Sequence, residues 1–139
     1  MCLYSVTSTK VLDHDLEVFK VVNYDKKSKH SFFGIFCHKE RVKKGLNFAK
    51  IITNIKTNNG YSIYESGFHC FEDSDSAVIF AYSTVFDCKK YKLKVRKFVI
   101  PEGTKVTIGI QGILSFSEEK PKTLYPVCIV TPVLINIGE

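Results

Sequence analysis

A histidine and a cysteine are adjacent in the segment Gly67–Phe71, which reads Gly-Phe-His-Cys-Phe. Nucleophilic catalysis by a cysteine needs a thiolate and a nearby base, and this pair supplies both residue types. Adjacent residues of a strand point to opposite faces of a sheet, so His69 and Cys70 cannot contact each other if the segment is extended. We therefore favour a buried structural thiol at Cys70, and we keep Cys70, His69 and Tyr64 as weak catalytic candidates.

The four histidines offer ligands for a metal ion together with nearby acids or a cysteine, but none of their spacings matches a known ligand signature. The five cysteines are an odd number without a C-x-x-C pair, which favours neither a zinc site nor a disulfide framework. We expect no metal and no cofactor. The residues weighed for a metal site are His14, His30, His38, His69, Asp13, Asp15 and Cys37.

Carboxylates, a usual residue type for general acid and base catalysis, gather near the start of a predicted helix. Their position already explains them, because an aspartate at a helix N-terminus caps free backbone N–H groups and interacts favourably with the helix dipole. We therefore prefer a structural role for this group, which consists of Glu65, Glu72, Asp73 and Asp75.

Clustered cations are the strongest functional signal in the chain. Residues 89–97 hold six lysines and arginines and no acid, and a second cluster lies within residues 39–50. Cations on a sheet face with aromatic neighbours can hold phosphates and stack bases, although a solvated outer sheet face carries the same pattern. The ligand-binding candidates are Lys92, Lys94 and Arg96, with Tyr91 as a stacking residue, and Arg41, Lys43 and Lys44 in the second cluster.

The net charge of +6 and the isoelectric point of about 9.0 favour encounters with anions. Among the 20 basic residues only Arg41 and Arg96 are arginines. Forked recognition of guanine needs arginine, so base-specific reading of a duplex is poorly supported. The expected partner is a nucleotide, a nucleic acid or an acidic protein surface. AT-rich coding DNA would produce the same lysine excess without any function.

Runs rich in β-branched and aromatic residues, separated by turn residues, predict a series of short strands. In one of them Tyr91, Leu93 and Val95 alternate with Lys92, Lys94 and Arg96, which predicts one buried face and one cationic face. The pair Asn59-Gly60 predicts a hairpin turn, and residues 117–122 are typical of a charged loop. The predicted strands span residues 2–8, 16–23, 31–37, 61–64, 91–100, 105–110, 113–116 and 127–135.

One helix is predicted over residues 74–86. Asp73 or Ser74 can cap its N-terminus, and Ala77, Phe80, Ala81 and Val85 share one face at helical spacing. Together the elements predict an α+β fold in a single globular domain, residues 1–139, with a mainly antiparallel, strongly curved sheet.

The terminal strand over residues 127–135 is apolar and could pair with a second copy across a homodimer edge. Pro132 within it predicts an edge or a bulge, because proline cannot donate to a ladder. No apolar run approaches the roughly 18–20 residues of a membrane span, and the N-terminus lacks the layout of a secretion signal. We therefore expect a cytoplasmic protein, in the source cell or in a host.

Three segments carry a resemblance: Gly-Phe-His-Cys-Phe at residues 67–71, the helix with Ala77 and Ala81, and the strand that ends in Ile-Pro-Glu-Gly at residues 100–103. In these segments, and in its Met-Cys-Leu-Tyr start, the chain resembles a loose group of small bacteriophage and bacterial proteins over about half of its length. The resemblance implies a shared fold and accessory work in an infected cell, such as blocking a defence system or sequestering a nucleotide signal. The chain departs from the group at residues 124–128.

A fainter similarity is to the mono-ADP-ribosyltransferase pattern, in which a Gly-aromatic strand precedes a helix with a central alanine and a later strand carries a catalytic glutamate. The late strands here offer no such glutamate, because Glu118 and Glu119 fall in the charged loop and Glu139 is the last residue. The similarity therefore implies the fold rather than the activity.

Three hypotheses of function follow. The first is a non-enzymatic binding protein, a phage or viral accessory factor, that engages an anionic partner through the basic sheet face. The second is a small nucleotide-directed enzyme, ADP-ribosyltransferase-like or a hydrolase, with His69 in a cleft beside the helix start. The third is a structural or self-assembling component that uses the terminal strand.

Overall fold

The computed structural model describes residues 3–25, 30–32, 41–42, 44–49, 53–81, 93–111, 113–116, 121–124 and 127–137. Their secondary structure consists of short strands and a single helix. The elements are β1 (Ser5–Val11), β2 (Leu16–Asp25), β3 (His30–Phe32), β4 (Arg41–Val42), β5 (Gly45–Phe48), β6 (Asn54–Lys56), β7 (Ile63–Glu65), β8 (Phe68–Phe71), α1 (Ser74–Ala81), β9 (Leu93–Ile100), β10 (Lys105–Ile110), β11 (Ile113–Phe116), β12 (Pro121–Leu124), β13 (Val127–Thr131) and β14 (Val133–Asn136).

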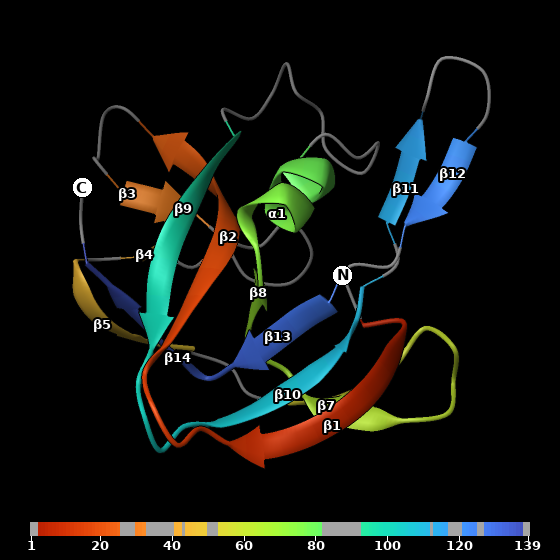
Figure 1. Cartoon of the computed structure of the whole chain (residues 1–139), viewed down its shortest axis with the longest axis horizontal. Coiled ribbons are helices and arrows are strands. Elements are labelled where there is room, and N and C mark those ends of the chain that lie inside the picture. Colours follow the sequence, from red (N-terminus) through yellow and green to blue (C-terminus); the bar gives the residue numbers. More distant parts are fainter. Residues whose placement is uncertain are drawn as a thin grey trace.

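The main sheet contains ten strands: eight follow the order β1-β10-β13-β8-β2-β9-β14-β5, while β3 pairs with β2 and β4 pairs with β3. The strand pairs within it are antiparallel. Two separate hairpins, β6–β7 and β11–β12, complete the described part of the chain. Figure 1 shows β2 and β9 running steeply while β1 and β10 cross below them, so the sheet is strongly curved. The prediction of an α+β fold with a curved, mainly antiparallel sheet and one helix is confirmed.

Both faces of the sheet are buried. Alternate residues of β2 enter two different groups of side chains: Val18 and Val22 join one, while Phe19 and Val21 join the other. We call the first the inner cluster, which comprises Leu12, Val18, Val22, Phe68, Cys70, Phe98, Ile100, Val106, Ile129 and Leu134. We call the second the helix-side cluster, which comprises Leu3, Val21, Tyr64, Phe71, Ala77, Cys128 and Val130.

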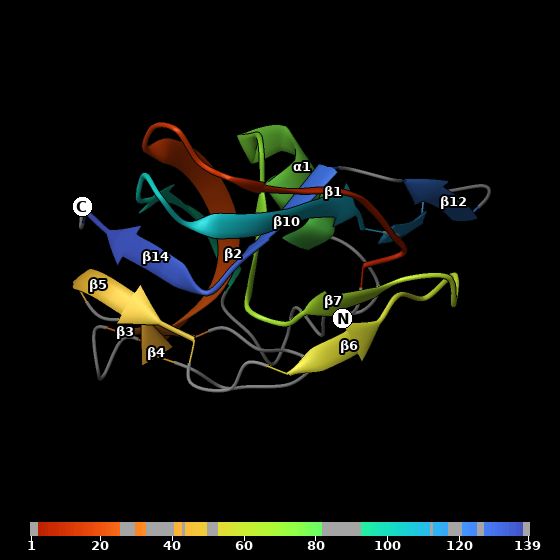
Figure 2. The ribbon, with the colours of Figure 1, turned by 90° about the horizontal axis from the view of Figure 1, so that it is seen from below.

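The inner cluster unites residues of β10 and of β14, which are far apart in the strand order. These side chains can meet only because the sheet curls around them. The opposite face is covered by α1, which packs on β2, β8 and β9, and by the β6–β7 hairpin, which contributes Tyr64 and Ile55. In Figure 2, α1 is seen above the ribbons of β1 and β10 and the hairpin below them. Two separate elements therefore cover this face.

The single buried face predicted for the strand at 91–100 is wrong over its C-terminal half. Val95 packs on the helix-side cluster, as the alternation predicts. Phe98 and Ile100, which share the strand face of Arg96, are nevertheless fully buried in the inner cluster, while Lys97 on the other face is exposed. The reason is that α1 covers one face near the start of β9 and the curled sheet covers the other face near its end.

The predicted terminal strand is in fact two strands with different neighbours. β13 lies between β10 and β8, and β14 lies between β9 and β5. Pro132 stands at the break, where the fully buried Thr131 accepts a hydrogen bond from the Val133 N–H at 3.3 Å and donates one to the Val133 carbonyl at 3.0 Å. Dimerisation by edge pairing of this segment would need a free edge, and both strands have hydrogen-bonded neighbours on each side.

The turn and the helix cap that short sequence patterns predict are confirmed. The β6–β7 hairpin turns at Asn59-Gly60, where Gly60 has a φ of 81°. Asp73 caps α1, because its carboxylate accepts a hydrogen bond from the Ser76 N–H at 2.7 Å. The helix is described as far as Ala81, and the rest of its predicted span lies outside the described residues. α1 is neither long nor apolar enough to cross a membrane, and no longer helix occurs in the described ranges.

Element boundaries were predicted less well. β1 starts and ends three residues later than predicted, because its end is fixed by backbone hydrogen bonds of Leu12 to Thr104 and Gly103. The charged loop predicted over 117–122 is shorter, since Pro121 already belongs to β12 and pairs with Phe116. Residues 38–60 contain β4, β5 and β6, which the sequence did not reveal.

We expect the substitution Gly109→Ala to destabilise the fold by about 1–3 kcal/mol, the usual cost of overpacking a close contact. A Cβ at this position of β10 would meet the Ser5 carbonyl oxygen and lie 2.8 Å from the Leu3 side chain. Chemical denaturation measures the change. The control is Ser8→Ala on the exposed part of β1, which we expect to have no measurable effect. Equal stability of the two variants would contradict the close packing of β1 on β10.

Candidate functional site

The histidine and cysteine of β8 lie on opposite faces of the sheet, as strand alternation requires. Cys70 is fully buried in the inner cluster beside Phe68. His69 lies on the other face, where its ring is 6.2 Å from the ring of Tyr64, centroid to centroid. The two residues therefore cannot act as a directly hydrogen-bonded thiolate and base.

His69 is held as a neutral ring. Its Nδ1 lies 3.3 Å from Oε1 of the buried Gln111, a hydrogen bond in which the ring N–H donates to the amide oxygen. Burial, helped by the positive charge of Lys20, lowers the pKa of His69 to about 3. A proton on this ring at neutral pH is thus strongly disfavoured, and the ring works as a packed polar residue.

The thiols of Cys70 and Cys128 are also held in their neutral form. Burial raises the pKa of Cys70 to about 12 and raises the pKa of Cys128 as well. A thiol that stays protonated at neutral pH is a poor nucleophile, because the thiolate is the reactive form. These positions support the structural interpretation of Cys70.

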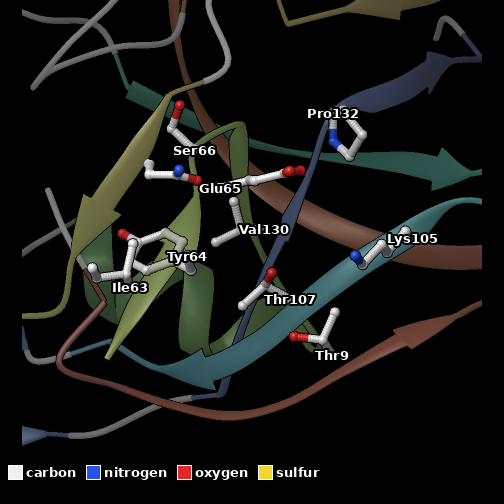
Figure 3. A pocket seen from close by; sticks show the side chains of 10 residues that line it. Thr9, Ile63, Tyr64, Glu65, Ser66, Lys105, Thr107, Val130 and Pro132 are labelled. Carbon is white, nitrogen blue, oxygen red and sulfur yellow. The ribbon is translucent and has the colours of Figure 1, made fainter. Parts of the chain in front are cut away.

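Tyr64 is fixed by the N-terminal segment. Its hydroxyl oxygen accepts a hydrogen bond from the Leu3 N–H at 2.8 Å, and the Leu3 and Tyr4 carbonyls accept bonds from Asn58 and Asn59 of the hairpin turn. Tyr64 is 5% exposed and lines an open pocket, whereas His69 does not line it. Tyr64 therefore borders a pocket (Figure 3), and the cleft predicted around His69 is a different feature from this pocket.

The first cation cluster gains a member that the sequence analysis missed. Lys20 of β2 is paired in register with Arg96 of β9, and Lys94 is paired with Val22 on the same face. Lys20 is only 7% exposed, and its Nζ donates a hydrogen bond to the His69 carbonyl at 2.7 Å. The alternation Val18, Lys20, Val22 was the available signal, since it places a lysine in line with two core residues.

The other residues of the first cation cluster differ in exposure and in the face of β9 on which they lie. Arg96 is partly buried, whereas Lys97 on the other face of β9 is exposed and forms an ion pair with Glu17 at 3.7 Å. Only the backbone of Lys94 is described, and Tyr91 and Lys92 lie outside the described residues. The solvated outer face considered as an alternative does not fit Lys20 and Arg96, because neither is fully exposed.

The second cation cluster does not join the first. Arg41 in β4 pairs with Phe32, Phe32 pairs with Asn23, and Asn23 pairs with Leu93. This register assigns position 41 to the sheet face of Leu93, which is opposite to the face of Lys94 and Arg96. Lys44 is exposed just before β5, and Lys43 lies outside the described residues. The two clusters therefore do not form one continuous patch on the described sheet.

Within the described ranges, no three side chains of histidine, cysteine, aspartate or glutamate come together in an arrangement that could hold a metal ion. Asp73, one of the four carboxylates considered for acid and base chemistry, is used as the helix cap. Comparison of the chain with protein-family models, with curated proteins and with solved structures finds no match.

We expect Cys70 and Cys128 to resist alkylation in the native protein, because both thiols are buried and protonated. The protein is treated with N-ethylmaleimide at pH 8, with and without 6 M guanidinium, and labelled peptides are identified by mass spectrometry. Both cysteines should remain unlabelled in the folded protein and react after unfolding. Rapid labelling of Cys70 in the folded protein would contradict the buried thiol and support Cys70 as a nucleophile.

We expect His69 to make stability depend on pH between about 6.5 and about 3. The unfolded chain takes up a proton near pH 6.5, whereas the folded ring does so only near pH 3, so the free energy of unfolding should fall as the pH is lowered through this window. Urea denaturation at pH 5 and pH 7.5 measures the change.

Replacement His69→Gln should remove this part of the pH dependence, since glutamine does not titrate. The matched control is Ser8→Ala on the exposed part of β1, which changes no titratable group and should keep the pH dependence of the parent protein. An unchanged pH dependence in His69→Gln would show that the pKa of His69 is not lowered in the folded protein.

Proposed function

We propose that this protein is a non-enzymatic binding protein that holds a phosphate-bearing ligand, a nucleotide or a nucleic acid, at the partly exposed Arg96 and the nearby Lys94 of β9, with the buried Lys20 of β2 adding its charge beside Arg96. The register that sets Lys20 opposite Arg96, with Lys94 two residues away on the same face, carries the proposal. Side chains of directly opposite residues start about 4.5–5.5 Å apart at Cβ. Cationic residues are thus concentrated in a small area of sheet.

Burial strengthens the attraction of this face for an anion. Lys20 is 7% exposed and Arg96 is partly buried, so water screens their charges less than those of the exposed lysines. The planar fork of an arginine fits two oxygens of a phosphate group, while lysines add point charges beside it. The net charge of +6 would steer an anion toward the protein from a distance.

The described side chains favour binding over catalysis. His69 is a neutral, packed ring and Cys70 a protonated thiol, and they lie on opposite faces of β8. Neither is arranged as a base or a nucleophile. With the resemblance to small bacteriophage and bacterial proteins, we extend the proposal to an accessory factor that sequesters such a ligand in an infected cell and so counters host defence.

The test removes two charges from the proposed face and two from elsewhere. The double variant Lys94→Gln/Arg96→Gln is compared with Lys10→Gln/Lys97→Gln, whose residues are exposed on β1 and on the opposite face of β9. Binding of a fluorescein-labelled single-stranded oligonucleotide and of ATP is measured by fluorescence anisotropy and calorimetry over a range of salt concentrations.

For the oligonucleotide we expect the first variant to bind at least about 10-fold more weakly, and its salt slope to fall by about 1.4, since each phosphate contact contributes about 0.7 on single strands. The control should bind within about twofold of the parent, because scattered surface charges act weakly. Thermal denaturation checks folding, and Arg96→Lys, which keeps the charge but loses the fork, should keep the salt slope of the parent while binding more weakly. Equal losses in both double variants, or no binding by the parent protein, would overturn the proposal.

A further inference from the structure

A second feature, separate from the cationic face, is a pocket between the β6–β7 hairpin and the strands β1, β10 and β13 (Figure 3). We call it the hairpin pocket. Its volume is about 190 Å³ and it opens to solvent. A water molecule occupies about 30 Å³ of liquid, so an occupant of amino-acid size fits, whereas drug-sized ligands usually occupy 300 Å³ or more.

The floor of the hairpin pocket is a row of side chains that crosses the sheet. Thr9 of β1 pairs with Thr107 of β10, which pairs with Val130 of β13, and Val130 pairs with His69 of β8. Thr107 is 8% exposed and Val130 is 2% exposed, so this floor is fixed by the sheet. The floor offers hydroxyl groups, and the accessible apolar surface of the pocket comes from Ile63 of β7, which is 70% exposed.

The opposite wall is equally well anchored. The ring of Tyr64 is held by the hydrogen bond from Leu3 to its hydroxyl and by its contact with His69. Ser66, at the end of the hairpin, accepts a hydrogen bond from the Thr53 N–H at 2.9 Å. Both residues are buried. The pocket is therefore formed before any ligand enters, which lowers the entropic cost of binding.

Two opposite charges line the pocket without pairing to each other. Glu65 of β7 and Lys105 of β10 are both exposed lining residues. Among the residues that the structure describes, Glu65 and Lys105 form no ion pair, unlike His14 with Asp13 and Lys97 with Glu17. Figure 3 shows their side chains reaching the pocket from different strands. A ligand thus meets both charges at separate points.

We propose that the hairpin pocket binds a free α-amino acid with an apolar side chain of moderate size, such as leucine. Its ammonium group is placed at Glu65 and its carboxylate at Lys105, with Thr107 as a hydrogen-bonding partner. The aliphatic side chain packs against the exposed Ile63, beside Val130 and the Tyr64 ring. A purely anionic ligand would be repelled by Glu65 and a purely cationic one by Lys105, so the pair of charges selects a zwitterion.

The experiment compares L-leucine with two analogues that each lack one charge, 4-methylpentanoate and isoamylamine. Binding to the full chain is followed by the chemical shifts of ¹⁵N-labelled backbone amides. We expect leucine to shift the amides of Lys105, Thr107 and Val130, and both analogues to bind at least 10-fold more weakly.

Variants that remove one charge test whether Glu65 and Lys105 bind the two charged groups of leucine. Glu65→Gln and Lys105→Gln should each weaken leucine binding at least 10-fold. In Glu65→Gln, leucine should no longer bind more tightly than 4-methylpentanoate. The ammonium group of leucine has lost its partner, and residue 65 no longer repels the carboxylate of the analogue. The matched controls are Glu72→Gln and Lys10→Gln, which are exposed and do not line the pocket, and they should bind leucine as the parent does.

The proposal is overturned if leucine causes no shifts at 10 mM, if the two analogues bind as tightly as leucine, or if the pocket variants and the controls behave alike. Oligonucleotide binding by Glu65→Gln should match that of the parent protein. The outcome is therefore independent of the proposal for the cationic face.

Discussion

Alternate residues of the central strands pack into two separate clusters, and this double burial is the constraint on which the rest of the structure depends. β2 and β8 have no solvated face where they cross the middle of the sheet, because the curled sheet encloses one side while α1 and the β6–β7 hairpin cover the other. Polar groups there must find partners inside the protein. Lys20 does so through the His69 carbonyl, and His69 through Gln111.

The two features that could bind a ligand therefore lie where the covering of the sheet ends. The cationic face occupies the part of β9 that precedes the buried Phe98 and Ile100, and the hairpin pocket occupies the gap between the hairpin and β10. The two features lie on opposite faces of the sheet, since Lys20 and Arg96 face the inner cluster while Val130 belongs to the helix-side cluster. A ligand at one does not obstruct the other.

The sequence predicted what depends on near neighbours. The turn at Asn59-Gly60, the cap at Asp73 and the opposite orientations of His69 and Cys70 all follow from local geometry, and the structure confirms them. The antiparallel α+β class also follows from the succession of short strands.

What the sequence could not reveal depends on coverage by distant elements. The alternation in 91–96 indicates two different faces, but it cannot show that the buried side changes by Phe98, because that depends on how far the sheet curls. Lys20 is hard to place from the sequence because all its neighbours from Val18 to Val22 are apolar, so the pattern does not show which face the curled sheet covers. The pocket combines residues from β1, β7, β10 and β13, whose pairing no local pattern specifies.

The strand register also determines when the protein can fold during its synthesis. β1 pairs with residues 105–110 and β2 pairs with residues 93–100, so the first two long strands find their main partners only after most of the chain has been made. Until then their edges are exposed on the nascent chain, and such edges favour pairing with other chains. The yield of folded protein in a cell should therefore depend on translation speed and on chaperones at the ribosome.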